Sequence, residues 1–407
     1  MILLAYKNLR ANTPNASHVG LGVTALNLEK SLGSDNAKAL AVVDGYDLWN
    51  RIFSQPDTTH VVMLAPYMHT AFTESLVKRF PKVMFALTCH SNVGFLQADR
   101  CAVKWLREGL ELSQRVLNFQ VAGNCQKLCE WLYGAYGINC LWLPNLYYLE
   151  PNYQLRKREM YASATLRLGI FGATRVQKNL MSAAAAALMM ARQVKAAKTE
   201  IWISSGRIEG GAGVVASIHE MLHSIPGVEL VEAGWYDWPD FRKLVRKMHL
   251  LLQPSYTESF NMVTADGIAE GVPSVVSPAI DWAPKYWQAC PDTVGDIARV
   301  GVKLLFYSRA SKDGLRALQK HNEKGLEAWS KWLSASLNSA ATAYAAPDSN
   351  MRKQGPDPPK PAATPLPQTT NIRRCPVGEP YRRLMSDLRG RRECALSILG
   401  SRPDYAP

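Results

Sequence analysis

The chain has 407 residues, 47% of them hydrophobic and 20% charged, which is enough for two globular domains with packed cores and excludes a largely disordered chain. The formal net charge of +13 raises the local concentration of anions at the surface. Nucleotides, anionic lipids and nucleic acids are therefore all candidate ligands, and charge alone does not choose among them.

Short β-rich runs alternate with longer amphipathic stretches over the first 150 residues. Strands are predicted at 2–6, 39–43, 60–65, 83–88, 115–118 and 140–143, and helices at positions that include 23–32, 72–80, 102–113 and 126–136. This βαβα order predicts a parallel sheet that is covered by helices on both faces.

The pattern restarts after a polar connection at about 150–158. A strand at 166–171 precedes a long alanine-rich helix, and further strands are predicted at 200–204, 228–233, 249–252 and 273–277. We therefore expect the α/β fold class, with two Rossmann-like, doubly wound domains at 1–150 and 151–325 that face a cleft. Ligands of such sheets bind beyond the carboxyl ends of the strands, and a cleft between domains is a common ligand site.

The end of the chain differs in composition from the rest. A helix at 326–340, with Trp329 and Trp332, is expected to cross back and brace the first domain. Nine prolines lie between Pro347 and Pro380, and such a segment cannot build a packed core. Residues 341–407 are therefore predicted to be a disordered Pro-rich linker and basic tail.

The N-terminus and the cysteines bear on the compartment. Residues 1–6 have neither a basic start nor a long apolar core, so they predict a first strand rather than a signal peptide. The longest apolar run, 181–191, is shorter than the roughly 18–20 residues that a membrane span requires. The eight cysteines include no Cys-x-x-Cys pair, which favours a reducing environment. The sequence thus predicts a cytoplasmic protein without a transmembrane segment.

The segment LLQPSYTESFNMVTADGIAEGVPSVVSP, residues 251–278, is the most informative part of the chain. A buried strand ends in Pro254-Ser255, a short loop carries Glu258, and a helix is predicted to begin at about Phe260. The first turn of a helix offers unpaired amide groups and the positive end of a dipole. The segment therefore predicts a pyrophosphate site made from backbone groups.

The segment LRLGIFGATRVQKN, residues 166–179, places two cations after a strand. A hydrophobic strand runs into Gly172, and Arg175 and Lys178 follow at the mouth of the next helix. Two cations at the end of a strand can neutralise a diphosphate as it leaves.

The segment 251–278 resembles the signature of family 4 and related retaining glycosyltransferases of the GT-B type, which reads Pro-Ser, then Glu-x7-Glu, then Gly-x-Pro. Glu258 matches the first acid and Asp266 stands at the second, one methylene shorter than the expected Glu. The resemblance implies that Glu258 binds the hydroxyls of the donor sugar and that Asp266 binds the nucleotide ribose. Residues Ser259, Phe260 and Asn261 stand where the family often has Gly-Phe-Gly, and we expect them in the donor site.

The same resemblance extends to the two cations. Arg175 and Lys178 match the Arg-x-x-Lys that opens the C-terminal domain in these families, about eighty residues before the first acid. It implies that both side chains hold the donor phosphates.

Three segments fit the resemblance less closely, and each has an alternative. Gly20 and Gly22 follow the first strand, where the family's glycine loop approaches the donor phosphates and the acceptor, although a tight turn without a ligand has the same pattern. His90 follows the strand at 83–88, where the families place a catalytic-site His that faces the donor sugar, and a structural His is the alternative. The aromatic run at 234–238 fits either a base-stacking pocket or an ordinary capped loop.

The sequence therefore predicts a glycosyltransferase that moves a hexose-type sugar from a nucleotide-diphosphate sugar with retention, using Glu258 and His90 as its catalytic residues. No Asp-x-Asp motif is present, so we expect neither a metal nor another cofactor. The candidate acceptors are anionic: a lipid-linked glycan, a polysaccharide or a modified nucleic acid, with a peripheral membrane contact through the basic surface. Two alternatives stay open, an inactive GT-B-like protein that binds nucleotide or nucleic acid, and a GT-B nucleotide-sugar epimerase.

Overall fold

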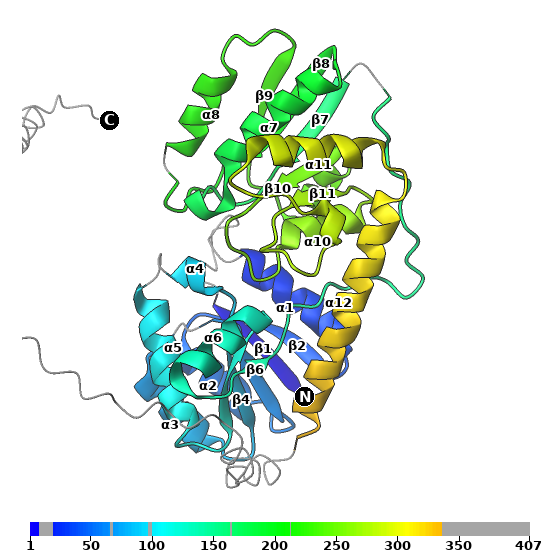
Figure 1. Ribbon diagram of the computed structural model, residues 1–407. Coiled ribbons are helices and arrows are strands. Elements are labelled where there is room, and N and C mark those ends of the chain that lie inside the picture. Colours follow the sequence, from blue (N-terminus) through cyan, green and yellow to red (C-terminus); the bar gives the residue numbers. More distant parts are fainter. Residues whose placement is uncertain (8–18, 66–67, 97–99, 163–164, 212, 336–407) are drawn as a thin grey trace, which may run out of the picture. The chain divides into compact units, whose positions relative to one another are not determined.

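A computed structural model describes residues 1–7, 19–65, 68–96, 100–162, 165–211 and 213–335 (Figure 1). The predicted linker and tail at 341–407 and the end of the helix predicted at 326–340 lie outside the described residues. None of the helices in the described ranges combines the length and the apolar composition needed to span a bilayer.

The first half contains a six-stranded parallel sheet in the order β2-β1-β3-β4-β5-β6. Its strands are β1 (Ile2–Lys7), β2 (Ala37–Val42), β3 (His60–Met63), β4 (Met84–Cys89), β5 (Phe119–Gly123) and β6 (Leu141–Trp142). The helices between them are α1 (Val19–Leu32), α2 (Gly45–Phe53), α3 (Thr70–Arg79), α4 (Val93–Leu96), α5 (Arg100–Ser113) and α6 (Gln126–Tyr136).

Alternation along β1 explains why this sheet carries helices on both faces. Leu3 and Ala5 belong to a core with α2, α3, α5 and α6, whereas Ile2 and Leu4 belong to a separate core with α1. Successive side chains of a strand point to opposite faces, so an unbroken apolar strand must be covered twice.

The strand predicted at 115–118 is wrong, because the strand begins at Phe119. Asn118 is buried just before it, and its Nδ2 donates to the carbonyl oxygens of Val77, Phe80 and Val83 at 3.2, 3.1 and 2.9 Å. This side chain ties the end of α3 to the start of β5, and 115–118 form turns that lead into the strand.

The second half contains a five-stranded parallel sheet in the order β11-β10-β7-β8-β9. Its strands are β7 (Thr165–Ile170), β8 (Lys198–Ser204), β9 (Val228–Ala233), β10 (Leu250–Gln253) and β11 (Ser274–Val276). The connections hold the 3-10 helices η1 (Val176–Lys178) and η2 (Lys285–Trp287), and α7 (Leu180–Gln193), α8 (Val214–Leu222), α9 (Trp238–Val245), α10 (Met262–Ala269) and α11 (Val294–Phe306).

The order of this sheet reverses between β7 and β10. From β7 the chain builds outward through β8 to β9, and it then returns to add β10 on the opposite side of β7. Ligands of open α/β sheets bind at such a switch point, beyond the carboxyl ends of the strands. The fold therefore favours the space after β7 and β10 as a ligand site.

Helix α12 (Ala310–Leu333) belongs to the cores of both halves (Figure 1). Leu318 packs into the core of the second half, and Trp329 and Trp332 pack into the core that contains α1. Gly325 lies against the chain that connects the halves, since a Cβ there would come within 2.5 Å of Leu146. The boundary expected between 325 and 326 thus falls inside one continuous helix.

Candidate functional site

The predicted donor-site residues gather after β7 and β10, at the switch point of the second sheet. Arg175 and Lys178 lie at η1, directly after β7, and Glu258 lies in the loop between β10 and α10. Because β7 and β10 are adjacent and parallel, their carboxyl ends open at the same edge of the sheet. Residues that are eighty positions apart in the sequence therefore come into contact.

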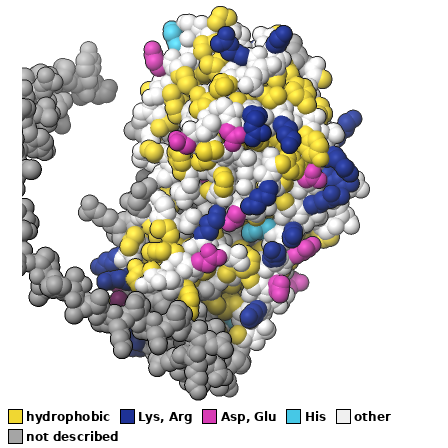
Figure 2. Space-filling model, viewed as in Figure 1, with side chains coloured by type: hydrophobic (Ala, Val, Ile, Leu, Met, Phe, Trp, Pro, Cys, Tyr) yellow, Lys and Arg dark blue, Asp and Glu magenta, His cyan; other side chains and the backbone are white. Residues whose placement is uncertain are grey.

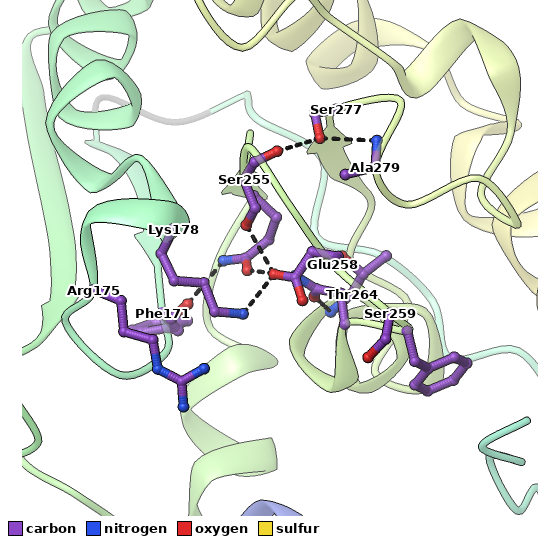
Figure 3. A network of polar contacts seen from close by, with 12 residues as sticks. Phe171, Arg175, Lys178, Ser255, Glu258, Ser259, Thr264, Ser277 and Ala279 are labelled. Atoms are coloured by element: carbon purple, nitrogen blue, oxygen red, sulfur yellow. Dashed lines mark hydrogen bonds and ion pairs between the residues drawn. The ribbon is translucent and has the colours of Figure 1, made fainter. Parts of the chain in front are cut away.

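Glu258 is the centre of this cluster (Figure 3). Its Oε1 accepts from Lys178 Nζ at 2.5 Å, from Ser255 Oγ at 2.8 Å and from Asn261 Nδ2 at 2.9 Å. The Glu258 and Lys178 side chains are only 10% and 18% exposed, so their attraction is less screened than that of a surface pair. Among the described residues no donor binds Oε2, which leaves that oxygen for a ligand.

The loop that carries Glu258 is held in place by its own polar groups. Asn261 has a φ of 70°, a left-handed conformation that Asn tolerates better than most side chains. Its Oδ1 accepts from Thr264 N at 2.8 Å and caps α10, while its Nδ2 also contacts Gln253 Oε1 at 3.2 Å. The amide of Thr264 is therefore occupied, and only the earlier amides of the first turn of α10 remain for the predicted pyrophosphate.

His90 faces this loop from the first half of the chain. It follows β4, and its carbonyl oxygen accepts from Ser259 Oγ at 2.7 Å. Asn124 Nδ2 lies 3.3 Å from His90 Nδ1 and 3.1 Å from Ser259 Oγ, so one amide bridges both residues. Burial lowers the pKa of His90 to about 4, and the ring is neutral at pH 7. With Nδ1 accepting from Asn124, the proton resides on Nε2, a buried atom without a partner among the described residues.

Arg175 does not contact Glu258 but pairs with a residue that sequence reasoning missed. Its Nε forms an ion pair with Glu209 Oε2, and its guanidinium lies over the Phe95 ring of α4, 4.8 Å from the centroid. Figure 3 shows this guanidinium turned away from Glu258. Glu209 also pairs with Arg207. The only signal in the sequence was an Arg-x-Glu shortly after β8, which matches no motif.

Asp266 requires a correction, because it does not reach the surface of the site. Its residue is 1% exposed, and its Oδ1 accepts from Tyr147 OH and Trp238 Nε1, both at 2.8 Å. The ribose contact predicted for it has no support in this structure. All of α10 from Thr264 to Ala269 is buried, so a side chain at this position points into the core.

Burial of Asp266 predicts a pH-dependent stability. Burial raises its pKa to about 7, whereas the unfolded chain releases that proton near pH 4. Between these two pH values the folded protein holds a proton that the unfolded chain has lost, so rising pH lowers the free energy of unfolding. Asp266→Asn keeps the acceptor oxygen and removes the titration. We expect it to raise the free energy of unfolding more at pH 8 than at pH 4.5, by several kcal/mol.

Urea denaturation at the two pH values measures this difference, with the exposed Asp240→Asn as a matched control. An Asp266→Asn effect of the same size at both pH values contradicts the assignment.

The packing of three further predicted donor-site residues is defined. The Phe260 ring is buried and stacks on Trp282, with centroids 5.1 Å apart, so its side chain packs into the core while its backbone stays in the loop that carries Glu258. Gly20 and Gly22 lie inside the first turn of α1 rather than in a loop. A Cβ at Gly22 would come within 3.3 Å of the Tyr6 ring, which gives that glycine a packing role.

Comparison with solved structures identifies the fold. The α,α-trehalose-phosphate synthase (UDP-forming) of Burkholderia xenovorans, solved with glucose-6-phosphate, matches with a TM-score of 0.57 at 10% identity over 82% of this chain and 100% of that chain. The corresponding synthase of Burkholderia vietnamiensis matches with a TM-score of 0.55 at 10% identity over 85% and 98%. A mutant of S. aureus TarM, solved with fondaparinux, α-GlcNAc-glycerol and UDP, matches with a TM-score of 0.52 at 14% identity over 71% of this chain.

The fold is GT-B. The comparison extends to the fold and no further at these identities, and this chain spans 59% of the length of the TarM chain. No protein-family model matches the sequence, and no curated protein matches it.

Both halves of the GT-B fold contribute to the candidate site. Besides the contacts of His90 and Phe95, Lys127 of α6 lies 3.1 Å from Asp281 and donates to the carbonyl oxygens of Pro278 and Ala279 at 3.3 Å. The residues that meet at Glu258 are thus bounded on one side by β4, α4 and α6 and on the other by the loops of the second sheet.

Proposed function

We propose that this protein is a glycosyltransferase that moves a hexose-type sugar from a nucleotide-diphosphate sugar. The observation that carries the proposal is Glu258, a mostly buried carboxylate at the switch point of a GT-B sheet, with one oxygen bound by Lys178 and the other without a donor among the residues that the structure describes. The similar structures support it, since one is a UDP-forming synthase and another was solved with UDP.

The residues divide the work between the sugar and the phosphates. Glu258 Oε2 accepts from the sugar hydroxyls and fixes the anomeric carbon in line for attack. His90 faces the site from the opposite side, and its Nε2–H, buried in this structure, is assigned to the sugar once the ring is uncovered. Arg175 and Lys178 stabilise the leaving diphosphate, where negative charge develops as the glycosidic bond breaks. Retention of configuration and independence from a metal are parts of the same proposal, and they rest on the resemblance of the motifs.

The acceptor is proposed as an anionic molecule because of the basic balance of the chain. Figure 2 shows Lys and Arg side chains spread over the visible face, with Asp and Glu among them, rather than in one patch of a single sign. A lipid-linked glycan, a polysaccharide and a modified nucleic acid remain the candidate classes, with a peripheral membrane contact for the first.

Arg175→Ala and Lys178→Ala are each expected to weaken binding of nucleoside diphosphate roughly ten- to hundredfold. A charge-assisted hydrogen bond to phosphate contributes about 1.5–3 kcal/mol, and each variant removes one donor group. The bare nucleoside is expected to bind equally well to both variants and to the wild type. Isothermal titration calorimetry checks this prediction, and equal losses for nucleoside and diphosphate would place the phosphate site elsewhere.

The proposal as a whole is tested with a panel of nucleotide sugars. A thermal-shift screen finds the donor, because a specific ligand raises the melting temperature by mass action. Release of nucleoside diphosphate is then followed in EDTA, with the donor alone and with candidate acceptors. Acceptor-dependent release that persists in EDTA supports metal-independent transfer. A donor that binds but is never turned over supports the inactive GT-B alternative, and conversion of the donor into an isomeric nucleotide sugar supports the epimerase.

A further inference from the structure

We propose that Glu209 is an internal competitor of the donor diphosphate, and that its carboxylate sets how tightly nucleoside diphosphate is held. This inference rests on the proposed function, because it concerns the same phosphate site. The Glu209 carboxylate pairs with Arg175, a cation that the donor diphosphate also needs. The diphosphate must therefore displace Glu209 before it can bind Arg175.

Both oxygens of Glu209 are engaged by arginines. Oε2 pairs with Arg175 Nε and Oε1 pairs with Arg207 Nη2. A carboxylate between two guanidinium groups makes the contacts that a phosphate group would make, because both anions fit the planar donor fork of arginine. The Glu209 side chain is 26% exposed, so solvent and a solute anion can reach the pair.

The backbone under Glu209 is fixed, so only its side chain is free to move. Glu209 N donates to Thr174 O and Thr174 N donates to Arg207 O, both at 2.8 Å, and Thr174 forms a parallel bridge with Ile208. These contacts tie the segment after β8 to the segment after β7 that leads into Arg175. The carboxylate therefore stays next to the phosphate cation and can leave it by rotation of its own torsions.

Two aromatic rings hold the arginines without help from Glu209. Arg175 lies over Phe95 at 4.8 Å, and Arg207 lies over Trp235 at 5.3 Å from the ring centroid. Cation–π contacts of this kind attract a guanidinium whether or not its counterion is present. If Glu209 only oriented Arg175, replacing Glu209 would let the Arg175 side chain move away from the phosphate site. If Glu209 is a competitor, Arg175 stays over Phe95 and becomes free to bind phosphate.

The charge of the cluster points in the same direction. The cluster holds three cations, Arg175, Arg207 and Lys178, and two carboxylates, Glu209 and Glu258, so its net charge is +1. A diphosphate carries more than one negative charge, so the cluster does not neutralise it. Removing the Glu209 charge doubles the net positive charge that faces the phosphates. Glu209→Gln should therefore bind diphosphate more tightly and release it more slowly.

The experiment uses inorganic pyrophosphate as the probe, since the base of the donor is not needed. Isothermal titration calorimetry on the full chain is expected to show that Glu209→Gln binds pyrophosphate about tenfold more tightly than the wild type. Glu200→Gln, the same substitution near the other end of β8, is the matched control and should bind like the wild type. Adding Arg175→Ala to Glu209→Gln should abolish the gain. Melting curves confirm folding, and the shorter Glu209→Asp provides a second variant, with a smaller gain expected.

The outcomes separate this inference from the proposed function. If the wild type binds pyrophosphate and Glu209→Gln binds it equally well or more weakly, the competitor proposal is overturned. Glu209 is then a residue that orients Arg175. A gain that Glu200→Gln reproduces also overturns it, because the effect would then be one of net charge. If the wild type binds neither pyrophosphate nor any nucleotide sugar, the proposed function fails and the inference fails with it.

Discussion

Replacing Glu258 by Gln is expected to lower sugar transfer by about a hundredfold while the protein stays folded. The substitution keeps the shape of the side chain, so Ser255 and Asn261 can still approach it. It removes the negative charge that strengthens hydrogen bonds from the sugar hydroxyls to the other oxygen. Small errors in the position of a reacting carbon cost about two orders of magnitude in rate.

The structure adds a second expectation for this variant. Lys178 loses its ion pair with Glu258, and its full charge becomes available to the phosphates. Binding of nucleoside diphosphate should therefore stay normal or become slightly tighter, while turnover falls. Steady-state kinetics and calorimetry on the same preparation measure the two effects, with Glu159→Gln, at an exposed ion pair, as the control. Transfer at the wild-type rate would show that the match of Glu258 to the family motif is coincidental.

Trp329→Ala is expected to lower the free energy of unfolding by about 3–5 kcal/mol, the usual cost of removing a buried Trp. Trp329 is 1% exposed and packs between α12 and the first sheet, and its Nε1 donates to Pro144 O at 2.9 Å. The substitution leaves a cavity and removes the donor of a buried carbonyl. Because Pro144 lies just after β6, the damage should reach the connection between the two halves.

Urea denaturation followed by tryptophan fluorescence and circular dichroism measures the loss. Leu326→Ala on the same helix is the matched control, since Leu326 is 40% exposed and its removal should change stability little. Trp329→Phe keeps most of the volume and tests the hydrogen bond by itself. A loss for Trp329→Ala no larger than that of Leu326→Ala would show that α12 does not brace the first sheet.

The sequence predicted the fold class because each strand and helix of both sheets can be recognised from residues that are neighbours in the sequence. The strands predicted at 83–88 and 249–252 are examples: β4 and β10 are buried at every residue, and each stands between two helices. The spacing of Pro-Ser, Glu and Gly-x-Pro also predicted that Glu258 lies in the loop after β10. This was possible because the strand, the loop and α10 are consecutive in the sequence.

The contacts of the site were less accessible to sequence reasoning. The Lys178–Glu258 and Arg175–Glu209 pairs join residues that are far apart along the chain, and nothing in the spacing of charges predicts which carboxylate meets which cation. Asp266 is different, because a signal was present: its helix is apolar or small at nearly every position, which indicates burial on all sides. The prediction followed the family motif, which places Asp266 at the ribose, rather than the apolar pattern, which places it in the core. In the structure Asp266 is buried.

Helix α12 has a consequence for the order in which the chain folds during synthesis. The face of the first sheet that contains Leu4 and Val62 is completed by Trp329 and Trp332. Residues that leave the ribosome first are thus covered by residues that leave it much later, after the second sheet. The amides of the first domain should therefore reach their full protection from exchange only when α12 has left the ribosome. Amide hydrogen exchange on ribosome-bound chains that hold α12 inside and outside the exit tunnel should show that step.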